Sequence, residues 1–257
     1  MNQPDIRMIL CDVDGTLLCK GEQVISGDVF SAIQKATDEN IQFVIASGRC
    51  YTNLRELFAP VLHSVYIVAS DGALAVKNDA VLYSKAIAKQ DAERFISVAQ
   101  SAGCTSSVLY SKDYVYCIGE IPKDVSCQSI ENTDDACGQI YKVAFYGLSS
   151  FAKYKIEHFA NASGKFSKVY ADALWIEFVA TGTDKGAACE ALQIQSGISV
   201  SETAAFGDNT NDFGMLRKAR VTFASPHAIP DITRMCKFRT DNVSNEIIKL
   251  TQERGTL

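Results

Sequence analysis

The sequence predicts an α/β protein whose parallel-sheet core carries an inserted segment of mixed α and β structure. Two observations lead to this prediction. At both ends of the 257-residue chain, short apolar runs alternate with helix-like stretches, as in β-α-β units. From about residue 73 to about residue 181, the pattern changes to hairpin-like strands, which suit an antiparallel sheet.

The first segment is predicted to hold three buried strands separated by two helices. Its apolar runs are short and nearly continuous, which is typical of strands that are covered on both faces. A Ser or Asp before the first helix can accept hydrogen bonds from the free amides of its first turn. The predicted elements are strands 6–11, 41–47 and 65–69, a helix from Ser26 or Asp28 to about residue 39, and a helix near 50–59.

The remaining elements define two predicted domains. Residues 1–83 and 182–257 would form a Rossmann-like catalytic core, and residues 84–181 an inserted α+β domain. A hairpin is expected over 73–84 around Asn78-Asp79. The insert is predicted to contain helices 89–102 and 149–161 and strands 105–110, 113–118, 139–146, 165–170 and 174–179. The last part is predicted to contain helices 184–196, 210–218, 227–233 and 244–252 and strands 202–206 and 220–224.

Composition excludes several classes of partner. A net charge of −5 argues against a nucleic-acid partner, which usually requires a basic face. No apolar run reaches the length of a membrane span, and the N-terminus lacks a secretory pattern, so we expect no membrane partner. The nine cysteines include no C-x-x-C pair and are expected to be free thiols in a reducing compartment. These observations predict a cytoplasmic protein, which we expect to be a monomer or a weak dimer.

The stretch "ILCDVDGTLL", residues 9–18, places two carboxylates, Asp12 and Asp14, directly after a buried strand. A simple turn is one explanation, because Asp-Gly commonly follows a strand. A calcium loop is excluded, because Leu17 stands where such a loop needs Gly and Gln23 where it needs Glu. The third explanation is a ligand site, because the carboxyl ends of parallel strands border the crevice where ligands bind.

Three further polar groups are predicted to reach the same edge of the sheet. They are Ser47-Gly48-Arg49, Thr183-Asp184-Lys185-Gly186 and the run from Gly207 to Asp212, "GDNTND". Taken singly, these are an ordinary loop, a solvated lysine and an Asx-turn. Four polar groups that meet at one sheet edge favour a catalytic site instead.

Together these four strings resemble the motifs of the haloacid dehalogenase-like phosphohydrolases, in the order that this family shows them. The insert between the second and third strings resembles the large C2-type cap of the Cof-like branch (subclass IIB). The resemblance covers the whole chain. One departure is Asp71-Gly72-Ala73, where many relatives have Asn-Gly-Ala.

The resemblance implies a Mg²⁺-dependent phosphatase that hydrolyses small phosphate monoesters, such as sugar phosphates or related metabolites. Asp12 would be the nucleophile that forms an aspartyl-phosphate, and Asp14 the general acid and then base. The Asp12 side chain, the Asp14 carbonyl and Asp208 would bind Mg²⁺, an ion that prefers oxygen ligands. The implied phosphate-binding residues are Val13, Ser47, Gly48, Lys185 and Asn211, and the implied supporting residues are Thr16 and Asp212.

Two alternatives use the same groups. A phosphomutase of the phosphomannomutase type would return the phosphoryl group to its substrate rather than to water. A phospho-acceptor signalling module is disfavoured by Asp14, which would hasten loss of the phosphoryl group, and by the insert. The sequence leaves the physiological substrate open. Candidate substrate contacts in the insert are Tyr116, Tyr170, Trp175 and Glu177, although ordinary sheet packing or a surface position is favoured for each.

Overall fold

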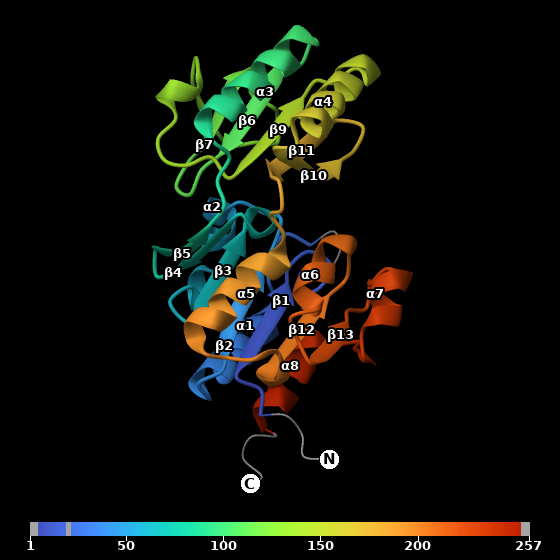
Figure 1. The fold of residues 1–257 in the computed structure, drawn as a ribbon. Coiled ribbons are helices and arrows are strands. Elements are labelled where there is room, and N and C mark those ends of the chain that lie inside the picture. Colours follow the sequence, from blue (N-terminus) through green and yellow to red (C-terminus); the bar gives the residue numbers. More distant parts are fainter. Residues whose placement is uncertain (1–4, 19–21, 253–257) are drawn as a thin grey trace. The chain divides into compact units, whose positions relative to one another are not determined.

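A computed structural model of the chain describes residues 5–18 and 22–252 (Figure 1). The chain divides into two compact units. Unit 1 comprises the residues up to Arg49, Asn53–Tyr83 and the residues from Asp184 onward. Unit 2 comprises Cys50–Thr52 and Ser84–Thr183. Each unit contains its own sheet.

The sheet of unit 1 has eight strands in the order β14-β13-β12-β1-β2-β3-β4-β5. The first six strands in this order are mutually parallel, and β4 runs antiparallel to β3. The strands are β1 (Met8–Asp12), β2 (Gln42–Ala46), β3 (Val65–Ala69), β4 (Leu74–Lys77), β5 (Ala80–Ser84), β12 (Thr203–Gly207), β13 (Val221–Ala224) and β14 (Phe238–Arg239). This α/β fold with a parallel core was predicted from the alternating apolar runs.

Helices cover this sheet through their apolar sides. Ala188 and Leu192 of α5 pack on Met8 and Leu10 of β1 in one buried cluster, and α5 lies across the sheet in Figure 1. Helix α1 packs against α8 and β2. The α-helices that carry residues of unit 1 are α1 (Gly27–Asp38), α2 (Tyr51–Leu57), α5 (Lys185–Ser196), α6 (Phe213–Leu216), α7 (Pro230–Met235) and α8 (Val243–Gln252).

The sheet of unit 2 has six strands in the order β10-β11-β9-β6-β7-β8, all antiparallel except the β7–β8 pair. Helices α3 and α4 lie on one face of it (Figure 1), and Phe95, Phe145 and Phe178 fill the core between. The elements are α3 (Lys89–Ser101), α4 (Ser150–Ser163), β6 (Ser106–Tyr110), β7 (Val115–Gly119), β8 (Gln128–Ser129), β9 (Lys142–Tyr146), β10 (Phe166–Ala171) and β11 (Trp175–Ala180).

Three predicted helices were wrong in extent. The helix predicted over 227–233 spans Pro230–Met235, because Pro230 favours the first helical position. The helix predicted near 50–59 ends at Leu57 and is followed by a 3₁₀ turn, Ala59–Val61. Pro60 lies in that turn, and proline disfavours helical conformation in the residue before it. The helix predicted over 210–218 is α-helical only from Phe213 to Leu216. The two-residue strands β8 and β14 were not predicted, because so short a run carries no period.

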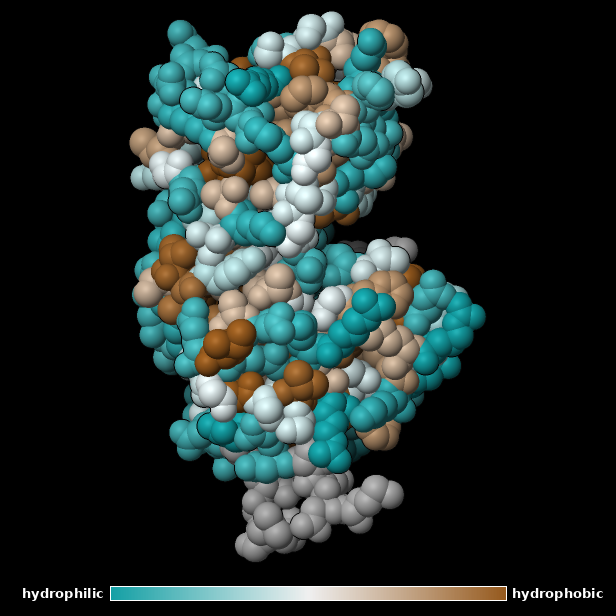
Figure 2. Space-filling view, in the orientation of Figure 1, coloured by the Kyte–Doolittle hydropathy of each residue, from teal (hydrophilic) through white to brown (hydrophobic). Residues whose placement is uncertain are grey.

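The described part of the chain has no helix long and apolar enough to cross a membrane. Figure 2 shows a mostly hydrophilic surface on which apolar side chains lie in small, separate groups. The eight cysteines that the structure describes are all free thiols, and Cys19 lies outside the described residues.

Candidate active site

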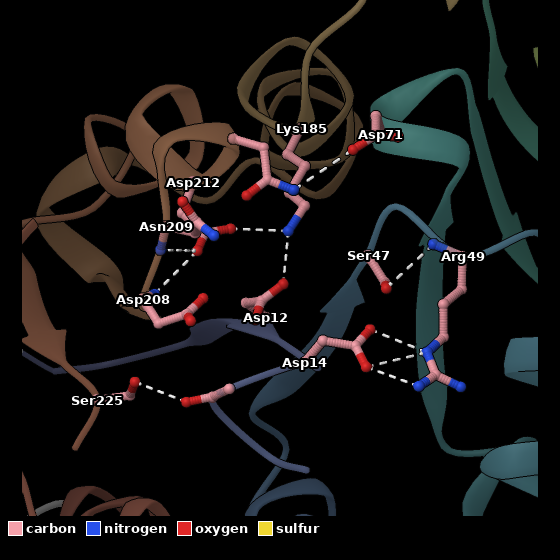
Figure 3. A network of polar contacts seen from close by, with 12 residues as sticks. Asp12, Asp14, Ser47, Arg49, Asp71, Lys185, Asp208, Asn209, Asp212 and Ser225 are labelled. Carbon is pink, nitrogen blue, oxygen red and sulfur yellow. Dashed lines mark hydrogen bonds and ion pairs between the residues drawn. The ribbon is translucent and has the colours of Figure 1, made fainter. Parts of the chain in front are cut away.

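Asp12 and Lys185 form the buried centre of the candidate site (Figure 3). Asp12 is the last residue of β1, and Lys185 is the first residue of α5. The Lys185 Nζ donates to Asp12 Oδ1 over 2.5 Å, and its side chain is fully buried. The other carboxylate oxygen, Asp12 Oδ2, is buried and has no hydrogen-bond partner in the described part of the chain. Asp12 therefore has one oxygen held by a cation and one that is unpaired.

Asp212 holds the loop after β12 in place. Its Oδ1 accepts from Lys185 Nζ over 2.7 Å. Its Oδ2 accepts from the amides of Asp208 and Asn209, over 2.9 and 3.1 Å. Because both oxygens already accept hydrogen bonds, Asp212 can orient Lys185 and Asp208 better than it can bind a further group.

Asp14 lies outside this buried cluster and pairs with a different cation. Arg49 binds both oxygens of Asp14, with Nη2–Oδ1 at 2.6 Å and Nε–Oδ2 at 2.8 Å (Figure 3). The Asp14 side chain is 51% exposed. The two acids therefore have different cationic partners within the chain: Lys185 contacts Asp12, and Arg49 contacts Asp14.

Arg49 contacts this site but was not predicted to take part in it, although it stands in the quoted Ser47-Gly48-Arg49 string. Its guanidinium also donates to Asn53 Oδ1 over 3.0 Å. A bidentate Arg–carboxylate pair fixes the plane of the carboxylate as well as its position. In the sequence, the indication of a role for Arg49 is its position directly after a strand end. Its partner, Asp14, is known only from the folded chain.

The loops after β2 and β3 lie side by side at the same sheet edge. Ser47 Oγ accepts from the Arg49 amide over 3.2 Å, and the Asp71 amide donates to the Ser47 carbonyl. Gly48 lies against Asp71, since a Cβ at Gly48 would stand 3.0 Å from Asp71 Oδ1. Asn211 Nδ2 reaches the same Oδ1 at 3.4 Å. Asp71, where many relatives were expected to have Asn, thus adds a further buried acid to this edge.

The turn after β1 requires glycine at position 15. Its φ of +90° is a conformation that residues with a side chain rarely adopt. A Cβ at this position would lie 2.2 Å from Asp208 Oδ2. Ser225 Oγ donates to the Gly15 carbonyl over 2.7 Å and fixes the turn from the other side. The turn therefore leaves room for Asp208 beside β1.

Two acids of this cluster, Asp12 and Asp208, have raised pKa values. Burial raises the pKa of Asp12 well above its usual range, Asp212 raises it further, and Lys185 opposes both. Burial and the neighbouring Asp212 also raise the pKa of Asp208 to about 7. Burial alone would lower the pKa of Lys185, but Asp12 and Asp212 raise it, so the ammonium stays charged. The cluster carries more negative charge than Lys185 offsets.

The residues present fit a divalent cation that prefers oxygen. Asp12, Asp208 and Asp212 each offer one oxygen, and these oxygens lie within 4.8 Å of one another. Asp12 Oδ2 is buried and has no hydrogen-bond partner among the described residues, so a cation bound beside it would supply the missing partner. Asp12 and Asp208 are the better ligands, because the oxygens of Asp212 are engaged by Lys185 and two amides.

The structure brings most of the predicted site residues to this one edge of the sheet. Val13 is fully buried, and its carbonyl accepts from the amides of Thr16 and Leu18. The Thr16 hydroxyl is buried and has no partner among the described residues. The predicted residues at this edge are Asp12, Val13, Asp14, Thr16, Ser47, Gly48, Lys185, Asp208, Asn211 and Asp212.

A family model, described as haloacid dehalogenase-like hydrolase, matches residues 9–248. The chain belongs to the haloacid dehalogenase-like hydrolases. It is 25% identical over 253 residues to the 5-amino-6-(5-phospho-D-ribitylamino)uracil phosphatase YcsE of Bacillus subtilis, covering 95% of this chain and 94% of the relative. It is 21% identical over 235 residues to an HMP-PP phosphatase of Escherichia coli, covering 88% of this chain and 86% of the relative.

Solved structures show the same fold. A haloacid dehalogenase-like hydrolase from Bacteroides thetaiotaomicron superposes with a TM-score of 0.84 at 18% identity, covering 95% of this chain and 99% of that one. A sugar phosphatase of subclass IIB gives a TM-score of 0.75 at 18% identity, covering 98% and 100%. The predicted membership of the haloacid dehalogenase-like phosphohydrolases is confirmed by the family model, and the predicted enzyme class of phosphoric monoester hydrolase by the curated relatives, which are named phosphatases. The subclass IIB neighbour shares the fold of this chain.

Proposed function

We propose that the protein is a Mg²⁺-dependent phosphatase that hydrolyses small phosphate monoesters through an aspartyl-phosphate on Asp12. The observation that carries the proposal is the state of the Asp12 carboxylate. Lys185 holds Oδ1, while Oδ2 is buried and unpaired within a cluster of acids. One oxygen of Asp12 would attack phosphorus, and the other would remain available to the cation. A bound Mg²⁺ would supply positive charge that offsets the acids and the phosphoryl oxygens.

Two acids would carry out the reaction, Asp12 as the nucleophile and Asp14 as the general acid and then base. In the first step the bond from an Asp12 carboxylate oxygen to phosphorus forms, the ester P–O bond breaks, and protonated Asp14 gives its proton to the departing oxygen. In the second step Asp14 takes a proton from water, which attacks phosphorus and releases phosphate from Asp12. Asp14 is proposed for this role because its half-exposed carboxylate lies at the same sheet edge as Asp12, and the bidentate contact with Arg49 would have to open before Asp14 carries the proton.

Two parts of the site would hold the phosphoryl group. Lys185 supplies a permanent positive charge at Asp12. Ser47, the amides of Val13 and Gly48, and Asn211 lie on the loops around it and are proposed as hydrogen-bond donors. We also propose residues 84–181, which lie within unit 2, as the substrate-specificity cap. The free thiols of the described cysteines support a cytoplasmic location.

The test is phosphate release from a panel of sugar phosphates and related metabolites by the full chain. A chelator should abolish release and added Mg²⁺ should restore it. Asp12→Asn should lower turnover at least about a thousandfold, since it removes the nucleophile. Asp241→Asn, a change at an exposed aspartate, is the matched control and should have no effect.

Two results would contradict the proposal. One is full activity of the metal-free protein or of Asp12→Asn. The other is conversion of one hexose phosphate into another without release of phosphate, which would identify a phosphomutase.

A further inference from the structure

The loop after β3 holds Asp71 in a backbone conformation that few side chains adopt. Ser70, Asp71 and Gly72 have φ values of +50°, +56° and +95°, all in the left-handed region. Two hydrogen bonds to the loop after β2 maintain this conformation. The Ser70 amide donates to the Arg49 carbonyl over 2.8 Å, and the Asp71 amide donates to the Ser47 carbonyl over 3.1 Å. Strain of this kind persists only where the surrounding contacts enforce it, and it is concentrated at functional sites.

The Asp71 side chain lies at the sheet edge that carries Asp12 and Ser47 (Figure 3). It contacts two of the residues proposed to bind the phosphoryl group. A Cβ added at Gly48 would stand 3.0 and 3.2 Å from the two Asp71 carboxylate oxygens. Asn211 Nδ2 lies 3.4 Å from Asp71 Oδ1. That distance is long for a hydrogen bond from nitrogen, typically about 2.7–3.2 Å, so orientation of Asn211 is a weak reason for an acid here.

Asp71 is a buried acid, with 7% of its surface exposed. Within residues 5–18 and 22–252, no lysine or arginine forms an ion pair with it. Two cations do lie at this edge of the sheet. Lys185 pairs with Asp12, and Arg49 pairs with Asp14. Because a buried charge without a counter-ion lowers stability, this carboxylate needs an explanation other than stability.

Neither the backbone nor the hydrogen bond requires a carboxylate at position 71. Asparagine tolerates the left-handed conformation as aspartate does. The oxygen of an amide could also accept from Asn211 in the same way as a carboxylate oxygen. What aspartate has and asparagine lacks is a negative charge at neutral pH. The charge is therefore the property of Asp71 that needs a function.

We propose that the charge of Asp71 weakens binding of the phosphoryl group and so speeds release of phosphate after hydrolysis. This inference rests on the proposed phosphatase function and concerns the release of its product. Like charges repel more strongly in a buried site than in water, because the effective dielectric constant is lower there. Ester and phosphate carry similar charge, so both would be weakened alike and the chemical barrier would stay the same. Faster product release matters because this step limits turnover in many enzymes.

Tungstate and perrhenate test this inference. Both are tetrahedral oxyanions of similar size, like phosphate in shape, but tungstate carries two negative charges and perrhenate one. Coulomb energy is proportional to the charge of the ligand. Removal of the Asp71 charge should therefore tighten tungstate binding about tenfold and perrhenate binding about threefold, the square root of that factor. Calorimetric titration of the full chain with Mg²⁺ at pH 8 measures both affinities without turnover.

Two neutral variants separate the charge from the shape of the side chain. Asp71→Asn keeps the shape and the acceptor oxygen, whereas Asp71→Gly removes both, and either residue suits a positive φ. Both variants should show the same changes in affinity. Asp79→Asn is the matched control, because Asp79 also has a positive φ, +62°, but lies exposed in the β4–β5 turn. This control should bind both oxyanions as the wild-type chain does.

Product inhibition gives a second measurement. In Asp71→Asn, the inhibition constant of inorganic phosphate against p-nitrophenyl phosphate should fall about tenfold, and kcat should not rise. Tungstate binding that tightens in the variants of a chain that releases no phosphate would contradict the phosphatase proposal and support the effect of Asp71 on anion binding. Unchanged affinities, equal factors for tungstate and perrhenate, or no tungstate binding by any variant would overturn the inference.

Discussion

Each unit of the molecule buries one lysine against acid, and the two clusters differ in charge balance. In unit 1, three carboxylates, Asp12, Asp208 and Asp212, gather around the single ammonium of Lys185. In unit 2, Lys142 pairs with Glu177, and its Nζ also lies 4.9 Å from the centre of the Tyr110 ring. The first cluster has an excess of negative charge, and the second pair is balanced. Both lysines are buried, so it is the excess of acid, and not burial, that marks the position suited to a cation.

The largest expected effect concerns Asp14, the acid that lies outside both buried clusters. Asp14→Asn should slow hydrolysis of alkyl phosphates by about 10²–10⁴-fold, because their leaving oxygen needs a proton. From p-nitrophenyl phosphate the first step should survive, since nitrophenolate departs without one. Rapid-quench measurement should show a burst of nitrophenol followed by slow phosphate release. Equal, wild-type-like rates on both esters would reduce Asp14 to a turn residue.

The next prediction tests the two lysines against each other. Lys185→Met should lower kcat/KM for p-nitrophenyl phosphate by about 10²–10³-fold, as loss of a preorganised charge does. Lys142→Met should leave this activity unchanged. Both variants break a buried pair and should lose about 3–5 kcal/mol in the free energy of unfolding, measured with urea.

The charge difference between the two sites predicts which variant a cation can rescue. Mg²⁺ should restore stability to Lys185→Met, whose cluster keeps its acids, and not to Lys142→Met. Equal rescue of both would remove the distinction drawn between them.

Arg49 is expected to have a smaller effect, because it orients Asp14 and does not carry the reacting groups. Arg49→Lys keeps the charge but loses the bidentate geometry, and should lower kcat on alkyl phosphates about tenfold with little change in KM. Arg49→Ala should be partly rescued by guanidinium ion in the assay. A rise in KM at constant kcat would instead show that Arg49 binds substrate.

The smallest effect is a shift in thermal stability with pH and metal. Because the folded chain raises the pKa of Asp208 from its usual value near 4 to about 7, it binds more protons than the unfolded chain between these values. Stability of the metal-free protein should therefore fall as pH rises through this window and level off above it. Mg²⁺ should raise the melting temperature by a few degrees more at pH 8 than at pH 5.5.

Asp208→Asn is the control for that measurement. It should flatten the pH dependence and reduce the gain from Mg²⁺. A gain from Mg²⁺ that is the same at both pH values, or that survives this substitution, would contradict the assignment of Asp208 as a ligand.

The longer strands of unit 1, and the edge at which its acids meet, were predictable from local sequence patterns. Strand β3 was predicted with its observed limits, and β1 and β2 were predicted to within two residues, because a continuous apolar run between polar turns is a local signal. The positions of Asp12, Lys185 and Asp208 followed, because parallel strands deliver their carboxyl ends to one edge.

The pairing of side chains could be seen only in the folded chain. The bidentate Arg49–Asp14 pair, the double engagement of Asp212 and the stacking of Tyr146 on Trp175 join residues from different strands and loops. Such contacts depend on sheet order, register and the alternation of faces, which no window of sequence contains. Apolar periodicity depends on residues that are close together along the chain, so it can be recognised in a short stretch of sequence. The partner of a charged side chain can lie anywhere in the sequence, because folding brings distant residues within hydrogen-bond distance.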